Sequence, residues 1–249
     1  ESGLSTLKEA LKVAKENKFN SLKARIYSNF WNIYRELGDL SRASKFYQWA
    51  LEINEELGDE LSQSAVMISI SNLLYDLFDY DNALEYANRC LEIFIKYNDK
   101  KRQMSVYHSL GNIYFKKEDH QHALINFKNS LTIAEPNTVG YMMANSGIGK
   151  VYYKLKDFDN ARKFLFEVLS QSQALSNIEG MIISEFYLGR IFFDEQNFTI
   201  ALEYFDKAFD CANEHSRKHD IMSIHEMYAK VYERMGDIVE AYENLKKYE

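Results

Sequence analysis

Ala83-Leu-Glu-Tyr-Ala-Asn-Arg-Cys90 has a small residue at each end and larger side chains between them. Its leading alanine recurs along the whole chain, at positions 43, 83, 123, 161, 201 and 241, with spacings of 40, 40, 38, 40 and 40. The copies that begin at Ala161 and Ala241 fit the pattern more loosely. A spacing this regular indicates an array of similar structural units.

A second pattern precedes each alanine by twelve residues. Its first position is mostly small and is occupied by Trp31, Ser71, Gly111, Gly149, Gly189 and Ala229. Three positions later comes a large side chain, namely Tyr34, Leu74, Tyr114, Tyr152, Phe192 and Tyr232. A short turn with Asp or Asn, such as Asp39 or Asn197, separates this half from the alanine-led half, and such residues cap helix N-termini. Each unit is therefore predicted to be a helix, a tight turn and a second helix.

Composition supports an all-α fold. The chain has 249 residues, with ten glycines and a single proline. Average usage would give about 12 prolines at this length, and β sandwiches and barrels need frequent turn residues. With 46% apolar and 27% charged residues the chain can bury a core. Its longest uncharged stretch, residues 61–75, is too short and too polar for a membrane span. The net charge of −7 weighs against non-specific nucleic-acid binding.

The repeated side chains are expected to form the core. We assign to it Tyr34, Phe46, Tyr114, Phe127, Tyr152, Leu165, Phe192 and Phe205, with Cys90 as a small apolar residue at an alanine position. Cys90 and Cys211 make no disulfide framework, which fits a reducing compartment. The first residue is Glu and no leader segment is visible, so the chain is expected to be a fragment.

The small residue, the aromatic three positions on, the Gly-Asp turn and the alanine stripe resemble the tetratricopeptide repeat. This resemblance implies a right-handed α-solenoid of antiparallel helix pairs. Repeats in that family commonly have 34 residues, so the extra residues here are expected between units, at Glu56–Glu60, Tyr97–Lys101, Leu175–Gly180 and His215–Asp220. The longer unit is similar to repeats of bacterial peptide-pheromone receptors and of the input regions of bacterial signalling proteins.

The whole chain, 1–249, is predicted to be one domain of such repeats. Residues 1–20 match the second helix of an incomplete unit. The repeats are expected at about 21–60, 61–100, 101–138, 139–178, 179–218 and 219–249, with the last one truncated. The lone Pro136 falls where the spacing drops to 38.

The resemblance also implies a binding groove on the concave face, lined by the residue after each small position. Those residues are Asn32, Asn72, Asn112, Lys150, Arg190 and Lys230. An Asn amide can pair with both the C=O and the N–H of a peptide backbone, and Lys and Arg can hold a carboxylate. We add the neighbouring side chains on the same helices that are expected to line the groove: Tyr75, Phe115, Tyr153, Phe193, His108 and Phe186. The expected ligand is an acidic or C-terminal peptide. The alternative is that these polar residues only solvate an inner helical face or bond to neighbouring helices.

No catalytic or metal-binding constellation is predicted, and no cofactor. The run from Ser146 to Lys150 lacks the strand and the Ser/Thr of a phosphate loop. His215 and His219 have no evident third ligand, and His225-Glu226 lacks the second histidine of a zinc-protease helix. Basic residues near Tyr152 are better explained as a solvated helix face than as a nucleic-acid site.

Three functions remain open. The first is a protein- or peptide-binding module, the regulatory input of a larger cytoplasmic bacterial signalling protein with, for example, a diguanylate cyclase or histidine kinase output. The second is a quorum-sensing peptide receptor of the phosphatase or transcription-regulator type. The third is a self-associating scaffold that dimerises through its terminal helices. No enzymatic activity is expected of this segment itself.

Overall fold

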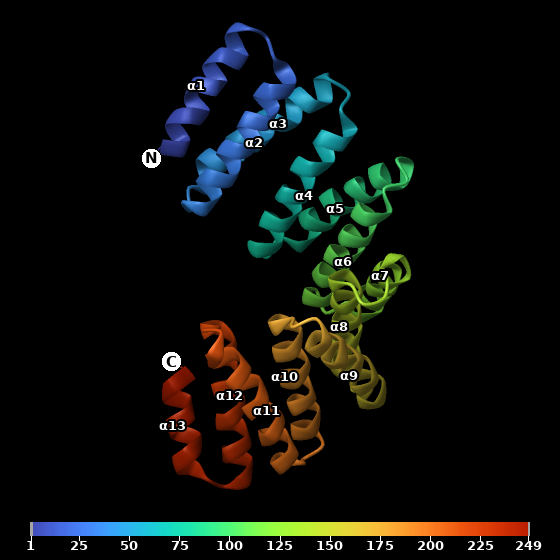
Figure 1. Cartoon of the computed structure of the whole chain (residues 1–249), viewed down its shortest axis with the longest axis vertical. Helices are drawn as coiled ribbons and strands as arrows, with labels where there is room; N and C mark the ends of the chain where they lie inside the picture. Colours follow the sequence, from blue (N-terminus) through green and yellow to red (C-terminus); the bar gives the residue numbers. More distant parts are fainter. Residues whose placement is uncertain (1, 249) are drawn as a thin grey trace. The chain divides into compact units, whose positions relative to one another are not determined.

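The computed structural model describes residues 2–248, and these form thirteen α-helices joined by short turns (Figure 1). The helices are α1 (Ser2–Glu16), α2 (Asn20–Glu36), α3 (Leu40–Glu56), α4 (Glu60–Asp76), α5 (Tyr80–Lys96), α6 (Lys100–Lys116), α7 (His120–Ile133), α8 (Val139–Lys154), α9 (Phe158–Ala174), α10 (Ile178–Asp194), α11 (Phe198–Glu214), α12 (Lys218–Met235) and α13 (Ile238–Tyr248). No strand occurs within residues 2–248. The predicted all-α fold of paired helices is confirmed.

Each helix packs mainly against its neighbours in sequence, as expected for a solenoid. The closest pairs are α2 with α3, α4 with α5, α8 with α9, α10 with α11 and α12 with α13. Successive pairs also pack on one another, for example α9 on α10 and α11 on α12. Residues 1 and 249, the outer ends of the predicted first and last units, lie outside the described residues.

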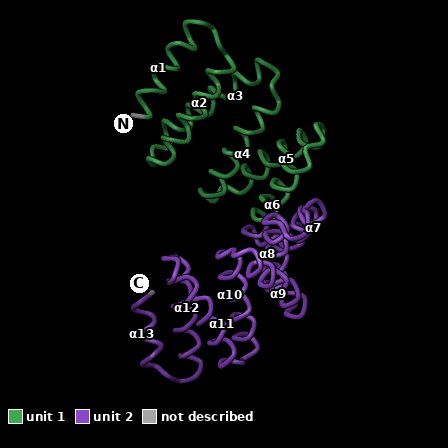
Figure 2. The backbone as a smooth tube through the Cα atoms, in the orientation of Figure 1, with its two compact units in different colours: residues 1–113 green, residues 114–249 purple. Residues whose placement is uncertain are grey.

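The chain divides into two compact units, residues 1–113 and 114–249 (Figure 2). The sequence predicted one domain. The boundary falls inside α6, whose residues up to Ile113 belong to the first unit and whose residues from Tyr114 belong to the second.

One type of turn joins all successive helices of the described residues except α7 and α8. At the end of α2, the N–H of Gly38 bonds to Arg35 O at 3.0 Å and the N–H of Asp39 bonds to Tyr34 O at 2.9 Å, which is the hydrogen-bond pattern of the Schellman motif. The Asp39 side chain then accepts from Arg42 N at 3.0 Å and so caps α3. Asp39 therefore ends one helix and starts the next.

The turn recurs about every 20 residues, twice as often as the alanine pattern. A residue with positive φ occurs at positions 18, 38, 58, 78, 98, 118, 137, 156, 176, 196, 216 and 236. The expectation that extra residues form longer connections between units is therefore wrong. They lengthen the helices, most of which have 17 residues. Apart from the connection after α7, the connections between and within repeats are alike.

The irregular spacing near Pro136 has two sources. α7 has only 14 residues and is followed by a longer connection, in which the C-cap Ala134 is extended at φ −69° and ψ 135°. Proline disfavours helical backbone in the residue immediately before it, here Glu135, so helices usually end at or before that residue. α8 has 16 residues, so the turn residues at 118, 137 and 156 are each 19 apart. One residue is thus lost on each side of Asn137.

The small positions let the two helices of a unit approach closely. A Cβ added at Gly189 of α10 would lie 2.6 Å from Phe205 of α11. Ser71 occupies the same position in the repeat of α4 and α5, and its hydroxyl donates to the Ala83 carbonyl at 2.8 Å. The leading alanines at 43, 83, 123, 161 and 201 are all 0% exposed. Small side chains on both helices therefore set the spacing within a unit.

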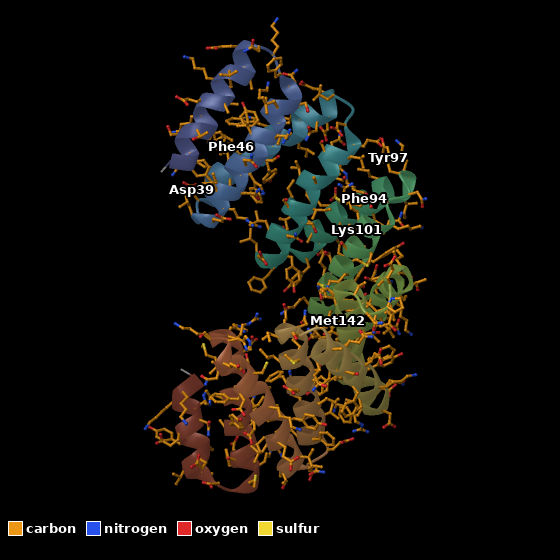
Figure 3. All side chains as sticks on the ribbon, viewed as in Figure 1. Asp39, Phe46, Phe94, Tyr97, Lys101 and Met142 are labelled. Atoms are coloured by element: carbon orange, nitrogen blue, oxygen red, sulfur yellow. The ribbon has the colours of Figure 1, made fainter. Side chains whose placement is uncertain are left out.

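The predicted core residues all pack in the interior. Tyr34, Phe127, Leu165, Phe205 and Cys90 are buried. Tyr114, Tyr152, Phe192 and Phe46 are half-buried against the core clusters of their own units. Figure 3 shows Phe46 on α3, close to the turn at Asp39.

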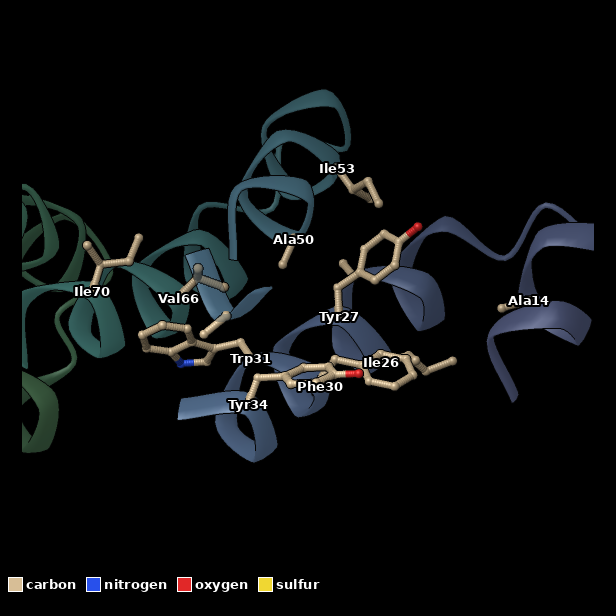
Figure 4. Close-up of a cluster of buried hydrophobic side chains, with 12 residues drawn as sticks. Ala14, Ile26, Tyr27, Phe30, Trp31, Tyr34, Ala50, Ile53, Val66 and Ile70 are labelled. Atoms are coloured by element: carbon tan, nitrogen blue, oxygen red, sulfur yellow. The ribbon is translucent and has the colours of Figure 1, made fainter. Parts of the chain in front are cut away.

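Trp31 departs from the repeat because it fills a small position with the largest side chain. It is 2% exposed and belongs to a cluster with Phe30 of the same helix and Val66 and Ile70 of α4. Figure 4 shows the indole ring between α2 and these α4 residues. Trp31 therefore fills space between neighbouring helix pairs.

We predict that Gly189→Ala lowers the free energy of unfolding by about 1–2 kcal/mol, because overpacking against the immobile Phe205 ring outweighs the better helix propensity of alanine. Urea denaturation followed by circular dichroism measures the effect. The matched control is Gly3→Ala in α1, where an added Cβ meets nothing within 4 Å and a small gain in stability is expected. Equal effects at both positions would contradict the close-packing account.

Candidate functional site

The six residues predicted to line the groove lie on the first helices of their units. Asn32, Asn72 and Lys230 are exposed. Asn112, Lys150 and Arg190 are half-buried, on α6, α8 and α10. The structure therefore distinguishes Lys150 and Arg190 from Lys230, although all three are cations at one repeat position.

Arg190 lies among aromatic rings. Its guanidinium carbon is 4.8 Å from the ring centre of Tyr153, 5.5 Å from that of Tyr187 and 5.7 Å from that of Phe186. The face of an aromatic ring attracts a cation, and this attraction strengthens where water is excluded. We call Lys150, Tyr153, Phe186, Tyr187 and Arg190 the cation–aromatic cluster; it joins α8 to α10, which pack directly against each other.

Lys150 is the second cation of this cluster. Its Nζ lies 5.7 Å from the ring centre of Tyr187. Burial lowers the pKa of Lys150, nearby Lys116 lowers it further, and Glu179 acts in the opposite direction. Loss of hydration makes the charged ammonium less favourable, so an anion placed beside Lys150 would restore the charged form.

The two cations of the cluster have no carboxylate partner. Within the described residues neither Lys150 nor Arg190 takes part in a salt bridge, whereas Lys230 pairs with Glu226 and Arg162 pairs with Glu195 at 2.6 Å. The Nε of Arg190 is shielded from water and has no hydrogen-bond partner among residues 2–248. Buried donors are almost always paired, so the described residues leave part of the hydrogen-bonding capacity of Arg190 unused.

Tyr153 supplies a neutral hydroxyl to the cluster. It is buried, at 8% exposure. Burial raises the pKa of Tyr153 to about 12, and Asp194 adds to this effect while Arg190 opposes it. The phenol therefore stays protonated near neutral pH and can donate or accept a hydrogen bond.

The amides of Asn72 and Asn112 line a common cleft. It has a volume of about 80 Å³ and also includes Tyr75 and Ser109. The structure thus brings two of the three predicted asparagines together. Asn32 lines a different and larger pocket in the first unit.

Four predicted groove aromatics have a packing role. Each contacts the ring at the first residue of the next helix, five positions on: the pairs are Tyr75–Tyr80 at 5.9 Å, Phe115–His120 at 5.9 Å, Tyr153–Phe158 at 6.1 Å and Phe193–Phe198 at 5.9 Å between ring centres. Truncating any of these rings would disturb the turn. The polar residues are therefore the better probes of binding.

Phe186 and His108 complete the predicted set. Phe186 is half-buried, with its ring centre 5.9 Å from that of Phe205, so it belongs to both the core of its unit and the cation–aromatic cluster. His108 is half-buried on α6. Neither residue is an exposed groove side chain.

Sequence reasoning missed Tyr187, which contacts both cations. It precedes Arg190 by three residues, and this spacing places two side chains on one face of a helix. This spacing could have identified Tyr187 as a neighbour of Arg190 from the sequence. By contrast, the contact between Lys150 and Tyr187 joins two units of the repeat and depends on how α8 packs on α10.

The residues considered for other chemistry have structural surroundings. Gly147 lies within α8, where a Cβ would meet the Phe127 ring at 2.5 Å. His225 is buried, with its Nδ1 2.9 Å from Asn244 Oδ1. No three His, Cys, Asp or Glu side chains gather in a potential metal site within the described part of the chain. Among residues 2–248, no helix combines the length and apolar character that a membrane crossing requires.

Two segments match models of a known repeat family. Residues 62–135 match one model described as tetratricopeptide repeat, and residues 22–57 match another with the same description. Residues 22–57 and 62–135 therefore carry tetratricopeptide repeats. The family resemblance stated from the residues is confirmed. A search of curated proteins found no match.

Solved structures of this fold resemble the chain over most of its length. It is similar to the apo form of RapI, with 18% identity, a TM-score of 0.75 and coverage of 91% of this chain and 96% of that one. A Rap protein complexed with competence and sporulation factor shows 16% identity and a TM-score of 0.70, covering 91% and 74%. The tetratricopeptide-repeat sensor protein PH0952 from Pyrococcus horikoshii, a signal transduction ATPase with numerous domains, shows 21% identity and a TM-score of 0.77; the match covers 97% of this chain but 38% of that protein. At these identities the similarity establishes the fold alone.

Glu185 of α10 is a buried carboxyl group that sequence reasoning also missed. It is 8% exposed. Burial raises the pKa of Glu185 to about 7, while Lys207 opposes the shift. Its electrostatic neighbours on α11 include Tyr204 and Cys211. Its folded pKa exceeds the unfolded value, so its contribution to stability is full below about pH 4.5 and is lost as the pH rises through 7.

We predict that Glu185→Gln stabilises the protein above pH 7, by about 1–3 kcal/mol, because a neutral amide avoids burying a carboxylate. The difference from wild type should shrink as the pH falls toward 5. Urea denaturation between pH 5 and 8 measures both trends. Glu203→Gln, at an exposed position on α11, is the control and should show no such trend. A stability difference that does not change with pH would contradict the prediction.

Proposed function

We propose that this chain is a peptide- or protein-binding module that docks a carboxylate against Lys150 and Arg190. The observation that carries the proposal is the pair of half-buried cations without a carboxylate partner among the described residues. A desolvated charge without a partner is costly, and a ligand that supplies the partner gains what the protein lacks. The rings of Tyr153 and Tyr187 would hold the apolar part of the ligand beside the charge.

The asparagines have a different role in this proposal. Asn72 and Asn112 line one cleft, and their amides can pair with a peptide backbone whatever its side chains. Within residues 1–113 this backbone pairing would supply affinity. Within residues 114–249, Lys150 and Arg190 would separately select ligands with a carboxylate, either acidic or C-terminal. The crystal structure of a Rap protein with competence and sporulation factor supports peptides as a ligand class for this fold.

We further propose a regulatory input role in a larger cytoplasmic bacterial signalling protein, with an output such as a diguanylate cyclase or a histidine kinase. The repeat sensor of PH0952 supports this role, because there the matched region is 38% of a signal-transduction ATPase. A quorum-sensing peptide receptor is the alternative within the same binding class, and RapI supports it. The sequence that flanks these residues in the encoded protein distinguishes the two.

A self-associating scaffold is the second candidate. The observation that favours it is the apolar surface of α13, where Ile238 is 65% exposed, Val239 73% and Tyr242 57%. A pocket of about 380 Å³ between α12 and α13 includes Ile238, Tyr242 and Leu245. Sedimentation at several protein concentrations, with and without peptide, distinguishes dimerisation through this helix from peptide binding.

We predict that Lys150→Gln and Arg190→Gln each weaken binding of peptides with a free C-terminal carboxylate by about tenfold, the usual scale of one charge-assisted hydrogen bond. Fluorescence anisotropy with a pool of synthetic pentapeptides, each made with a free and an amidated C-terminus, measures the effect. Wild-type affinity should also fall as salt concentration rises.

The matched control is Lys230→Gln, because Lys230 occupies the same repeat position but is already paired with Glu226. It should leave affinity nearly unchanged. If all three variants bind the peptides as tightly as wild type, the carboxylate site is wrong. An affinity that is independent of salt would count against it as well.

A double variant, Asn72→Ala with Asn112→Ala, should weaken free-acid and amidated peptides alike, by about five- to tenfold, because it removes backbone hydrogen bonds and leaves the cations in place. The same anisotropy assay applies. Asn88→Ala on α5, an exposed amide that bonds only to the Leu84 carbonyl of its own helix, is the control. Wild-type affinity in the double variant would exclude the backbone role.

A further inference from the structure

The first unit contains a polar pocket of about 330 Å³ between α2, α3 and α4. Arg25, Ser28 and Asn32 line it from α2. Ser62 and Ser69 line it from α4, and the buried Asn54 lines it from α3. Its size is at the lower end of the range of small-ligand sites, about 300–1,000 Å³, and is sufficient for one side chain with its adjoining backbone.

Trp31 also lines this pocket and is the unusual residue there. The equivalent positions in later units are small, for example Gly149 and Gly189. Its indole ring packs edge-on against Tyr47 at 5.5 Å between centres. The indole N–H is shielded from water and has no acceptor among the described residues. An indole can only donate, so it requires an acceptor.

The charge of the pocket also favours an acceptor ligand. No Asp or Glu is among its lining residues, and the nearby Asp59 carboxylate already accepts hydrogen bonds from the backbone N–H and the hydroxyl of Ser62. Arg25 is exposed and takes part in no salt bridge within residues 2–248, unlike Arg42 of α3, which pairs with the Asp39 that caps its own helix. The two donor-only groups, Arg25 and Trp31, therefore lack a protein acceptor at the same pocket.

We infer that this pocket binds the carboxylate side chain of an Asp or Glu residue in a bound peptide. Arg25 would supply the charge, the Trp31 N–H a directional hydrogen bond, and the asparagine amides further donors. The hydroxyls of the lining serines already donate within the protein. The inference rests on the proposal that the chain binds peptides, but it uses none of the residues assigned to the cation–aromatic cluster. Trp31 would then make this pocket in residues 1–113 selective for an acidic residue within the bound peptide, as distinct from its C-terminus.

The experiment is a titration monitored by ¹H–¹⁵N NMR of the tryptophan indoles in the full chain. The chain has two tryptophans, Trp31 and Trp49, and Trp49 is 43% exposed and outside the pocket lining. The probe is N-acetyl-glutamate N′-methylamide, and its uncharged isostere is the glutamine derivative. We expect a saturable shift of the Trp31 indole signal with the glutamate probe, a much weaker one with the glutamine probe, and none at Trp49.

A variant at an exposed position tests the role of the charge without disturbing the core. Arg25→Gln should raise the dissociation constant of the glutamate probe about tenfold. Arg89→Gln, an exposed arginine on α5 that stacks on Tyr86, is the matched control and should not change it. No saturable Trp31 shift, equal shifts with both probes, or equal affinity in Arg25→Gln would each overturn the inference.

The outcome is separable from that of the proposed function. Loss of peptide binding in Lys150→Gln together with an unresponsive Trp31 would support the carboxylate site of the second unit and overturn the pocket of the first. A saturable Trp31 shift, together with unchanged peptide affinity in Lys150→Gln and Arg190→Gln, would support the pocket and overturn the proposed docking site.

Discussion

The turn that ends one helix on the residue that starts the next is the constraint on which the rest of the structure depends. At Gly38-Asp39 the backbone N–H groups of both residues bond to carbonyls of α2, and the Asp39 side chain accepts from the first turn of α3. Since non-glycine residues such as Phe78 and Glu118 also adopt positive φ here, the turn is formed at a cost of about 1–2 kcal/mol for each of them. The hydrogen bonds and the packing of the two helices outweigh that cost. Outside the longer connection after α7, such a short connection forces consecutive helices to be antiparallel and adjacent.

Regular turns leave little freedom to the helices, so differences between units come from side chains at equivalent positions. Position 150 and position 230 both carry lysine, yet only Lys230 has an acid one turn earlier, at Glu226. Lys150 instead faces Tyr187 and lies near Lys116. The same backbone therefore presents a neutralised cation in one repeat and a desolvated cation in another. Binding specificity on such a scaffold depends on which neighbours a charge lacks.

The sequence was sufficient to predict the helix pairs, the caps and most of the core, because each depends on residues close together along the chain. The Ala83 and Ala201 stripes and the Asp39 cap are of this kind. The 20-residue recurrence of the turn was hidden, since its key position is defined by backbone dihedral angles and accepts Gly, Phe, Glu, Ser and Asn alike.

The site was only partly predictable for a different reason. Asn72 and Asn112 could be selected by their repeat position, but the burial of Tyr153 and the isolation of Arg190 result from packing between α8 and α10. The pocket beside Trp31 likewise depends on three helices. Repeat position identifies which residues are equivalent, whereas their charge environment is set by neighbours that differ from one unit to the next.

Because most contacts join neighbouring helices, a bound ligand stabilises the chain mainly near its own site. α10 packs on α9 and α11 and more lightly on α8 and α12, so interactions extend only a short way along the chain. In such arrays stability is close to a sum of local terms, and segments can open independently. A ligand held between α8 and α10 would stabilise the helices around it far more than the distant ones. Ligand binding would therefore slow local opening most in the helices around the site, and this protection would decrease with distance along the sequence.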